Sequence, residues 1–459
     1  MTETLKATIR DSVAARWGAL LIVAFTMMAA YFFTDVMSPL KTMLETYNGW
    51  DSSDYGFFTS GYGWFNVFFL MLIFGGLMLD KLGIRITGVT SASLMVIGAG
   101  LKYFAISNMA LTESTILGIN SQVMLASLGF AIFGVGCEVS GITVTKIIVK
   151  WFKGHEMATA MGIQVALARL GMMLAMSVTV PVAKYFGVTD HPLVAAPILF
   201  GAVALCAGLF AFFIYTFMDK KLDRQLSDSG TEVEEESFRL SDVKMILVNK
   251  GFWLIALLCL LFYSSVFPFM KYATDLMINK FHVDEDFAGA IPGLLPFGTL
   301  FLTPLFGLIY DKKGKGATIM IIGACILLFV HLIFTIPFLN NWMLAVAMMI
   351  LLGIGFSLVP SAMWPSVAKI IPEKQLGSAY ALIFWIQNIG LMGVPFLVGK
   401  VLENYCKLPP VDGKPAYDYT LVMIIFSSFA LLSIFVAIAL KREDKKKGYG
   451  LEQKNAVED

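Results

Sequence analysis

Long apolar runs alternate with short polar segments along almost the whole chain. A helix needs about 20 apolar residues to cross a hydrocarbon core about 30 Å thick. Runs of this size predict twelve transmembrane helices, at residues 17–40, 55–79, 86–107, 119–149, 157–181, 193–218, 252–274, 287–310, 316–337, 342–369, 376–400 and 418–440. Glycines and prolines fall inside several runs, which membrane helices tolerate because neighbouring groups satisfy the freed backbone atoms. The pattern therefore predicts an all-α membrane protein.

Two similar polar segments divide the chain into halves. The first reads GLMLDKLGIR from Gly76 to Arg85, and the second reads GLIYDKKGKG from Gly307 to Gly316. Each follows an even-numbered span, and their separation of 231 residues (307 minus 76) is about half of the 459-residue chain. Such an offset indicates an internal repeat of two six-helix halves. We expect the halves at 17–218 and 252–440, joined by a polar linker at 219–251.

Composition and charge fix the environment and the orientation. The chain is 58% hydrophobic and 15% charged, whereas soluble domains carry about 25% charged residues. Its net charge of +1 gives no reason to expect a nucleic-acid partner. Of the 34 lysines and arginines, 24 lie in the termini and in the loops after even-numbered spans, which predicts that residues 1–16, the linker and 441–459 are cytoplasmic. Because no Asn-x-Ser/Thr acceptor occurs, we expect the plasma (inner) membrane of a prokaryote rather than a glycosylating compartment.

The repeated segments also predict a conformational switch. Their glycines are expected to let two helices approach closely, while their aspartates bind a neighbouring helix end in one state and release it in another. A tight basic turn that only sets topology would need the cations but not the aspartates. We assign gating roles to these residues: Gly76, Asp80, Lys81, Arg85, Gly307, Asp311 and Lys312. The motif Gly-x-x-x-Asp-Lys/Arg-x-Gly-x-Lys/Arg at this place is similar to the signature of the major facilitator superfamily.

Two opposite charges lie inside predicted spans. Glu138 is 12 residues from Lys150, and Arg169 is 13 residues from Glu156, so both lie about 18 to 20 Å from the same membrane surface. Charges at this depth cost about 2.5 to 3.5 kcal/mol each and usually pair or line a polar pathway. One reading is a structural ion pair between the fourth and fifth spans. The other is a substrate site, in which the cation receives a carboxylate and the anion an ammonium.

Further polar residues at similar depth are candidates for the same site. They are Asp35 in the first span, Tyr62 in the second, Tyr263 and Lys271 in the seventh, Trp364 in the tenth, and Gln387 and Asn388 in the eleventh. Tyrosine near a span end is also typical of an interfacial belt. Asp35 and Lys271 are expected near the outer mouth of the cavity. Two carriers fit these residues: one for dipeptides, and one for small carboxylate anions, coupled to protons or to exchange, in which Arg169 and Lys271 bind the substrate and Glu138 only orients Arg169.

An enzyme is disfavoured. The chain has no Gly-x-Ser-x-Gly, His-Glu-x-x-His or Walker-type segment, and His331 is the histidine that falls inside a predicted span. We therefore expect no catalytic residues, no cofactor and no metal site.

The chain resembles the lysosomal dipeptide-transporter branch of the major facilitator superfamily, in a prokaryotic form, from about residue 20 to 440. The resemblance rests on these segments: YFFTD at 31–35, GYGWFNV at 61–67, WFKGHE at 151–156, ARLG at 168–171, VFPF at 266–269 and WPSVAKIIPEKQLGSAYALIFWIQNIGL at 364–391. It implies dipeptide transport, mainly by uniport, with the peptide termini held by Glu138 and Arg169. Lys271 departs from the lysosomal pattern, which leaves the side-chain preference open. The dileucine signal and glycosylated loops are absent, so we expect a monomer without an accessory subunit.

The acidic residues inside the predicted spans indicate whether transport is coupled to protons. A proton symporter needs a carboxyl group that changes its protonation state with conformation. Arg169 at the same depth should keep Glu138 charged. Asp35 has no partner evident from the sequence and is the alternative proton site, although a place near the outer end of the first span should keep it hydrated. We therefore expect alternating access without proton coupling.

Overall fold

The computed structural model describes residues 9–152, 155–188, 191–227, 240–372 and 375–454, and these ranges are almost entirely helical. The first half contains η1 Ile9–Asp11, α1 Val13–Asp35, η2 Ser38–Leu40, α2 Lys41–Tyr47, α3 Ser52–Ser60, η3 Gly61–Gly63, α4 Trp64–Phe68, α5 Met71–Ser107, η4 Met109–Glu113, β1 Thr115–Ile116, β2 Ile119–Asn120, α6 Ser121–Phe152, α7 Met157–Tyr185 and α8 Ala195–Ser227. The second half contains α9 Leu240–Val248, α10 Lys250–Phe281, α11 Glu285–Ala288, α12 Ala290–Lys313, α13 Gly316–Thr335, α14 Trp342–Ile370, α15 Leu376–Tyr405, β3 Lys407–Val411, β4 Lys414–Tyr417 and α16 Thr420–Lys447.

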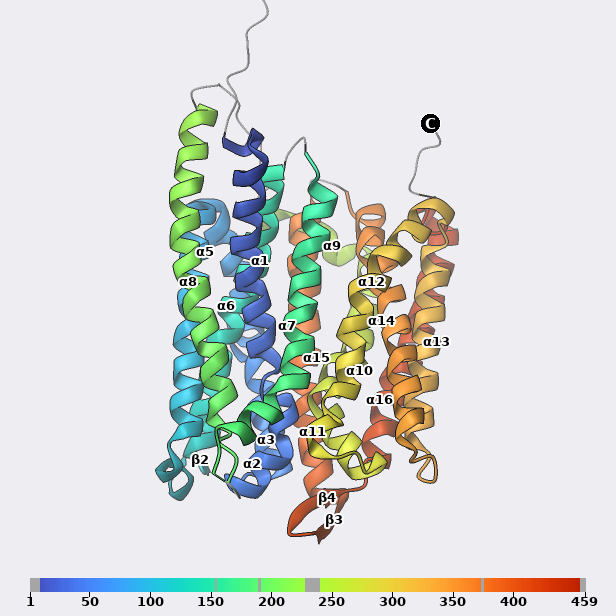
Figure 1. Ribbon diagram of the computed structural model, residues 1–459. Helices are drawn as coiled ribbons and strands as arrows, with labels where there is room; N and C mark the ends of the chain where they lie inside the picture. Colours follow the sequence, from blue (N-terminus) through green and yellow to red (C-terminus); the bar gives the residue numbers. More distant parts are fainter. Residues whose placement is uncertain (1–8, 153–154, 189–190, 228–239, 373–374, 455–459) are drawn as a thin grey trace, which may run out of the picture.

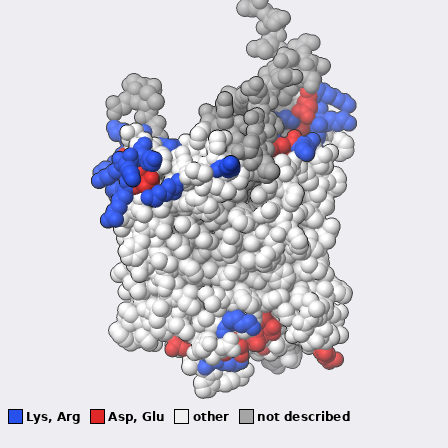
Figure 2. Space-filling model, turned by 180° about the vertical axis from the view of Figure 1, so that it is seen from behind, with Lys and Arg blue, Asp and Glu red and all other residues white. Residues whose placement is uncertain are grey.

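The helices run side by side in two groups, with both chain ends at one face (Figure 1). We call this the terminal face. The β1–β2 and β3–β4 hairpins lie at the opposite face, which we call the hairpin face. Lys and Arg gather at the terminal face, a smaller charged group lies at the hairpin face, and a wide band between them carries little charge (Figure 2). This band is what a protein that spans a membrane presents to lipid.

The second predicted span differs most from the expected form. Residues 55–79 do not form one helix but run through α3, η3, α4 and the start of α5. Eleven helical segments of the described chain are long and apolar enough to cross a membrane. Helix α5 contributes to two crossings because it bends at Gly83, whose φ of 75° is readily adopted only by glycine. Counted in this way, the described chain has the twelve crossings that the sequence predicts.

The predicted linker at 219–251 is partly helical. Helix α8 extends to Ser227, and the short helix α9 precedes α10, while residues 228–239 lie outside the described part of the chain. The sixth span is therefore followed by a polar helical extension, which the mixed charge of the segment did not indicate.

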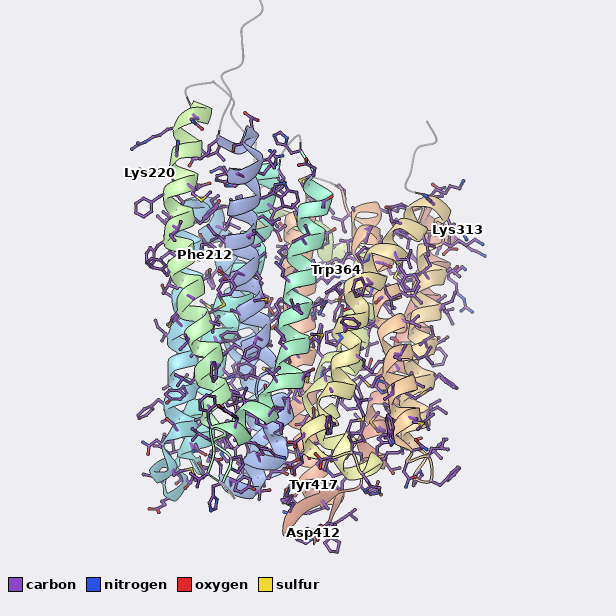
Figure 3. The ribbon with its side chains drawn as sticks, viewed as in Figure 1. Phe212, Lys220, Lys313, Trp364, Asp412 and Tyr417 are labelled. Carbon is purple, nitrogen blue, oxygen red and sulfur yellow. The ribbon has the colours of Figure 1, made fainter. Side chains whose placement is uncertain are left out.

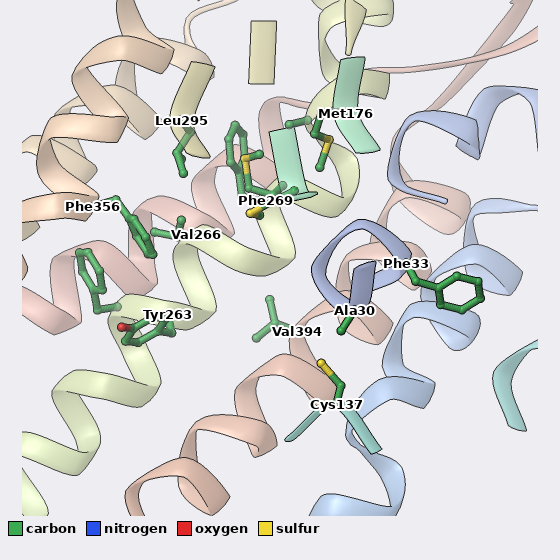
Figure 4. Packing of buried hydrophobic residues seen from close by; sticks show 14 of the residues in the cluster. Ala30, Phe33, Cys137, Met176, Tyr263, Val266, Phe269, Leu295, Phe356 and Val394 are labelled. Carbon is green, nitrogen blue, oxygen red and sulfur yellow. The ribbon is translucent and has the colours of Figure 1, made fainter. Parts of the chain in front are cut away.

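Small residues position the helices that carry the candidate site. A Cβ on Gly171 in α7 would lie 2.1 Å from the Met28 carbonyl oxygen in α1, so these helices touch backbone to backbone. Between the halves, a Cβ on Gly56 in α3 would lie 2.8 Å from the Gly399 Cα in α15. Small residues allow such approaches in membrane helices. Apolar side chains fill the remaining space, as for Tyr263 and Phe356, which pack together in Figure 4.

Candidate substrate site

A cavity of about 630 Å³ lies between the two halves. It is lined by α1, α3, η3, α5, α6 and α7 from the first half and by α10, α14 and α15 from the second. Eight of the nine predicted substrate-site residues line it: Asp35, Tyr62, Glu138, Arg169, Tyr263, Lys271, Trp364 and Gln387. Asn388 is 1% exposed and lies behind the wall, where its side chain interacts with Glu138. The polar residues predicted from separate spans therefore meet in and around one cavity.

Glu138 in α6 is oriented by a tyrosine. The Tyr62 hydroxyl donates a hydrogen bond of 2.8 Å to Glu138 Oε1. Gly134, one turn earlier in α6, makes this contact accessible, because a Cβ there would lie 2.3 Å from the Tyr62 carbonyl oxygen. Because the second span is interrupted, η3 lies directly against α6, and the Tyr62 hydroxyl reaches the Glu138 carboxylate.

Arg169 in α7 has no carboxylate partner within 4 Å among the described residues. Its guanidinium lies 5.4 Å from the Phe356 ring centroid and 6.0 Å from that of Tyr31. Nη1 is buried without a hydrogen-bond partner in the described chain. The reading of Glu138 and Arg169 as a structural ion pair is therefore wrong in this structure. A buried donor without an acceptor is costly, and a bound anion would satisfy it.

Asp35 and Lys271 form an ion pair across the halves. Lys271 Nζ in α10 lies 2.5 Å from Asp35 Oδ1 and donates a second hydrogen bond of 2.7 Å to the Thr34 carbonyl oxygen. Asp35 is 3% exposed. The expectation of a hydrated Asp35 without a partner is wrong, because the basic residue that meets it is 236 positions away in the sequence and sequence patterns within one span cannot reveal it.

Aromatic side chains form the wall on the side of the second half. Trp364 Nε1 donates a hydrogen bond of 3.1 Å to the Tyr263 hydroxyl, and the Trp364 ring stacks on Phe384 with 4.9 Å between centroids. Trp364 lies between the halves in Figure 3. Gln387 accepts a hydrogen bond from the Cys259 thiol. These residues therefore line the site rather than an interfacial belt.

Several polar lining residues were not among the predicted site residues, including Thr34, Gln164 and Tyr380. Gln164 carried a signal, since it lies five residues before Arg169 in an otherwise apolar span. Thr34 and Tyr380 did not stand out among the many hydroxyl residues of the chain. Among the described residues, no group of three or more His, Cys, Asp or Glu side chains could hold a metal ion.

The repeated motif lies at the terminal face. Asp80 Oδ1 lies 3.2 Å from Lys146 Nζ, and Arg85 lies 3.0 Å from Asp223. Asp311, Lys312 and Lys81 are exposed. The expected close approach is absent at the first glycine of each copy, because a Cβ on Gly76 or Gly307 would meet no described atom within 4 Å. In the first copy, Asp80 and Arg85 contact other helices of the first half, which the sequence of a single span could not show.

The halves meet closely at the hairpin face. Lys41, which follows the first predicted span, is 1% exposed and contacts Asp275 of the second half at 2.9 Å. Gly289 at the start of α12 packs on the backbone of α7 at the same face, where a Cβ would lie 2.1 Å from the Met176 carbonyl oxygen. The cavity is therefore separated from the hairpin face by a close contact between the halves.

Comparison with known proteins identifies the family. The lysosomal dipeptide transporter MFSD1 of Homo sapiens is 26% identical over 444 residues, which covers 96% of this chain and 88% of that protein. MFSD1 of Gallus gallus is 28% identical over 359 residues, 77% of each chain. A bacterial homolog of the human lysosomal transporter Spinster, in an inward-facing and occupied conformation, has the same fold, with a TM-score of 0.70 and 13% identity over 95% of this chain and 98% of that chain. These relatives are transporters and not enzymes. Because the Major Facilitator Superfamily model matches residues 20–395, well over half of the chain, the protein belongs to the Major Facilitator Superfamily and is a multi-pass membrane transporter.

Proposed function

We propose that this transporter carries dipeptides by alternating access of the cavity to the two faces, as a uniporter. The observation that carries the proposal is the buried, unpartnered Nη1 of Arg169 in the same cavity as Glu138. The guanidinium is suited to the carboxylate of a peptide, since it can donate two parallel hydrogen bonds. Glu138, held by Tyr62, is suited to the ammonium at the other end.

The charge balance of the cavity supports a zwitterion. Asp35 and Lys271 neutralise each other at 2.5 Å, which leaves one unpaired cation and one unpaired anion, Arg169 and Glu138. A cavity of about 630 Å³ also lies within the range of about 300 to 1,000 Å³ that small-molecule sites occupy. The names of the MFSD1 relatives point to the same substrate class.

A carrier for small carboxylate anions is the second candidate, and one observation disfavours it. That reading assigned Glu138 the task of orienting Arg169, yet no hydrogen bond or ion pair joins the two side chains in the described chain. A carboxylate in the cavity would then repel an anion without any compensating role. The pairing of Asp35 with Lys271 also removes the reason for naming Asp35 as a proton carrier, which favours uniport.

The orientation is part of the proposal. We place the terminal face in the cytoplasm of a prokaryote, because its basic residues outnumber those of the hairpin face. The contact at the hairpin face then makes this structure an inward-facing state. The protein is expected to act as a monomer without an accessory subunit.

The test is binding to the purified protein, measured as thermal stabilisation by a neutral dipeptide. Arg169→Ala is expected to abolish the stabilisation, whereas Arg224→Ala, which removes an exposed arginine from the end of α8, should keep it. Peptides with an acetylated amino end or an amidated carboxyl end should fail to bind. Equal stabilisation by free and blocked peptides, or by dicarboxylates in place of dipeptides, would contradict the assignment.

A further inference from the structure

Three ionisable side chains are buried together where the halves meet at the hairpin face. Lys41 Nζ lies 2.8 Å from Glu45 Oε1 in α2 and 2.9 Å from Asp275 Oδ2 in α10, and all three side chains are 1% exposed. The group contains two carboxyl groups and one ammonium. If both acids were ionised, the buried cluster would carry an uncompensated negative charge, and buried charges without a partner usually become neutral instead.

Among the described residues, the groups that contact the cluster supply hydroxyl donors, and the nearby cations are paired with other acids. Tyr417 donates a hydrogen bond of 3.1 Å to Glu45 Oε1, and Tyr419 donates one to Asp275 Oδ2. Burial, as the largest cause, raises the pKa of both phenols, so they remain donors. The Ser52 hydroxyl in α3 donates a hydrogen bond of 2.8 Å to Glu45 Oε1. Around them, Glu403 pairs with Lys407, and Lys271, one turn before Asp275, pairs with Asp35.

The two acids differ in how fully hydrogen-bond donors satisfy their carboxyl oxygens. Both oxygens of Asp275 are satisfied, Oδ1 by the Thr42 hydroxyl at 2.9 Å and Oδ2 by Lys41 and Tyr419. Glu45 Oε1 accepts from Lys41, Ser52 and Tyr417, whereas Glu45 Oε2 is buried without a partner in the described chain. Asp275 thus has the surroundings of a carboxylate. Glu45 has one buried carboxyl oxygen that no donor of the described chain stabilises, so it is the acid whose negative charge is less well compensated, and a proton on Oε2 would remove that charge.

We propose that Glu45, together with Lys41 and Asp275, is a proton-binding site that fills when the hairpin face closes. Opening that face separates Asp275 from Lys41 and admits water, so the Glu45 O–H bond breaks and the proton leaves to the solvent at the hairpin face. The same proton would enter from that side on closing. Since it never reaches the terminal face, the site makes the opening pH-dependent without coupling transport to a proton gradient.

The proposal rests on alternating access and not on the identity of the substrate. Its sign follows from the proton count: the closed state holds one more proton than the open state. Glu45 loses its proton at a lower pH in the open state than in the closed state. Between these two pH values, each unit of rising pH should lower the ratio of closed to open protein by about tenfold, because one proton is released on opening. A hydrated glutamate titrates near pH 4.3, so we expect the effect to extend upward from about that value.

The experiment measures this ratio on the full-length protein in lipid nanodiscs. Spin labels on Leu117→Cys and Phe338→Cys, which are 92% and 80% exposed on loops of the two halves, report the separation at the hairpin face, with exposed Cys206 and Cys325 replaced by serine. The closed fraction should fall as pH rises from 5 to 8. Glu45→Gln, which mimics the protonated acid, should make the ratio independent of pH.

Two further variants test the charge count. Asp275→Asn leaves one acid and one cation in the cluster, so the closed-to-open ratio should also become independent of pH. This second variant keeps the proposal testable if Glu45→Gln does not fold. Lys41→Met leaves two acids without a cation, and its profile should steepen toward about a hundredfold per pH unit. Asp286→Asn breaks the exposed pair between halves with Lys184 and should leave the slope unchanged.

The two failures can be told apart. If closed and open populations are both present but the parent ratio does not depend on pH, or if Glu45→Gln keeps the slope, the proton site is wrong and alternating access stands. If the distance between the labels keeps its closed-state value at every pH, with and without dipeptide, both alternating access and the proton site are wrong.

Discussion

Lys271 Nζ lies 2.5 Å from Asp35 Oδ1, and this contact joins α10 of the second half to α1 of the first within the wall of the cavity. The pair places two charges in the site without adding net charge. A peptide side chain that reaches this wall would meet a neutral group. The relationship therefore bears on which dipeptides are accepted, as well as on how the halves are held together.

Removing one member of this pair should change the side-chain preference. In Asp35→Asn, Lys271 loses its partner, so dipeptides with an acidic side chain should gain affinity relative to neutral ones by about tenfold, or about 1.4 kcal/mol. In Lys271→Met, the unpaired Asp35 should favour basic side chains to a similar extent. Competition binding with acidic, neutral and basic dipeptides measures both.

Each variant also breaks a buried ion pair, which costs about 3 to 5 kcal/mol when one charge is left alone. The melting temperature of the ligand-free protein should therefore fall in both, and binding is compared below that temperature. An unchanged order of preference in two folded variants would show that peptide side chains do not reach this pair.

Tyr62→Phe should weaken dipeptide binding. The Tyr62 hydroxyl is the hydrogen-bond donor at 2.8 Å that orients Glu138 Oε1. Hydrogen bonds to charged groups contribute about 1.5 to 3 kcal/mol, so the loss should be about tenfold or more. Isothermal titration with a neutral dipeptide measures it, and Tyr185→Phe, at an 82% exposed position, is the control. Unchanged affinity in Tyr62→Phe would mean that Glu138 does not need this donor.

The sequence predicted the composition of the site better than its internal pairing. Hydropathy fixed the spans, and counting residues from the polar turn between α6 and α7 put Glu138 and Arg169 at one depth, in the cavity that both now line. The depth of a residue does not show in which direction around the helix axis its side chain points. Residues at the same level can face each other or lie apart, and the expected contact between Glu138 and Arg169 is absent from the described chain.

Contacts across the halves could not be predicted for the same reason. Lys41 follows the first span, as a loop residue would, yet it is buried by Asp275 from 234 residues away. The break of the second span was also hidden, because residues 55–79 taken together contain enough apolar residues for one continuous helix. Tertiary contacts, here the approach of Tyr62 to Gly134, decide where such a helix is interrupted.

Asp80→Asn should shift the balance between conformational states and leave the binding site intact. Asp80 lies at the terminal face, 3.2 Å from Lys146, and does not line the cavity. Weakening this contact changes the free energy of one state relative to the other, so apparent affinity should change only through the population of the competent state. Dipeptide affinity in a variant locked in one conformation should stay within about twofold of the parent. A large loss of affinity there would place Asp80 at the substrate.

Two glycines of α7 should respond in opposite ways to alanine. A Cβ on Gly171 would lie 2.1 Å from the Met28 carbonyl oxygen, whereas one on Gly162 would meet no described atom within 4 Å. Gly162→Ala should be neutral or stabilising, because alanine favours a helix by about 1 kcal/mol over glycine. Gly171→Ala must separate α7 from α1, at a cost of about 1 to 3 kcal/mol for overpacking. The melting temperature should therefore fall only in Gly171→Ala. Dipeptide affinity should fall with it, because Arg169 lies two residues earlier on the displaced helix. A melting temperature for Gly171→Ala equal to that of the parent would show that the two helices do not need backbone contact, and Arg169 would then be positioned by its ring contacts alone.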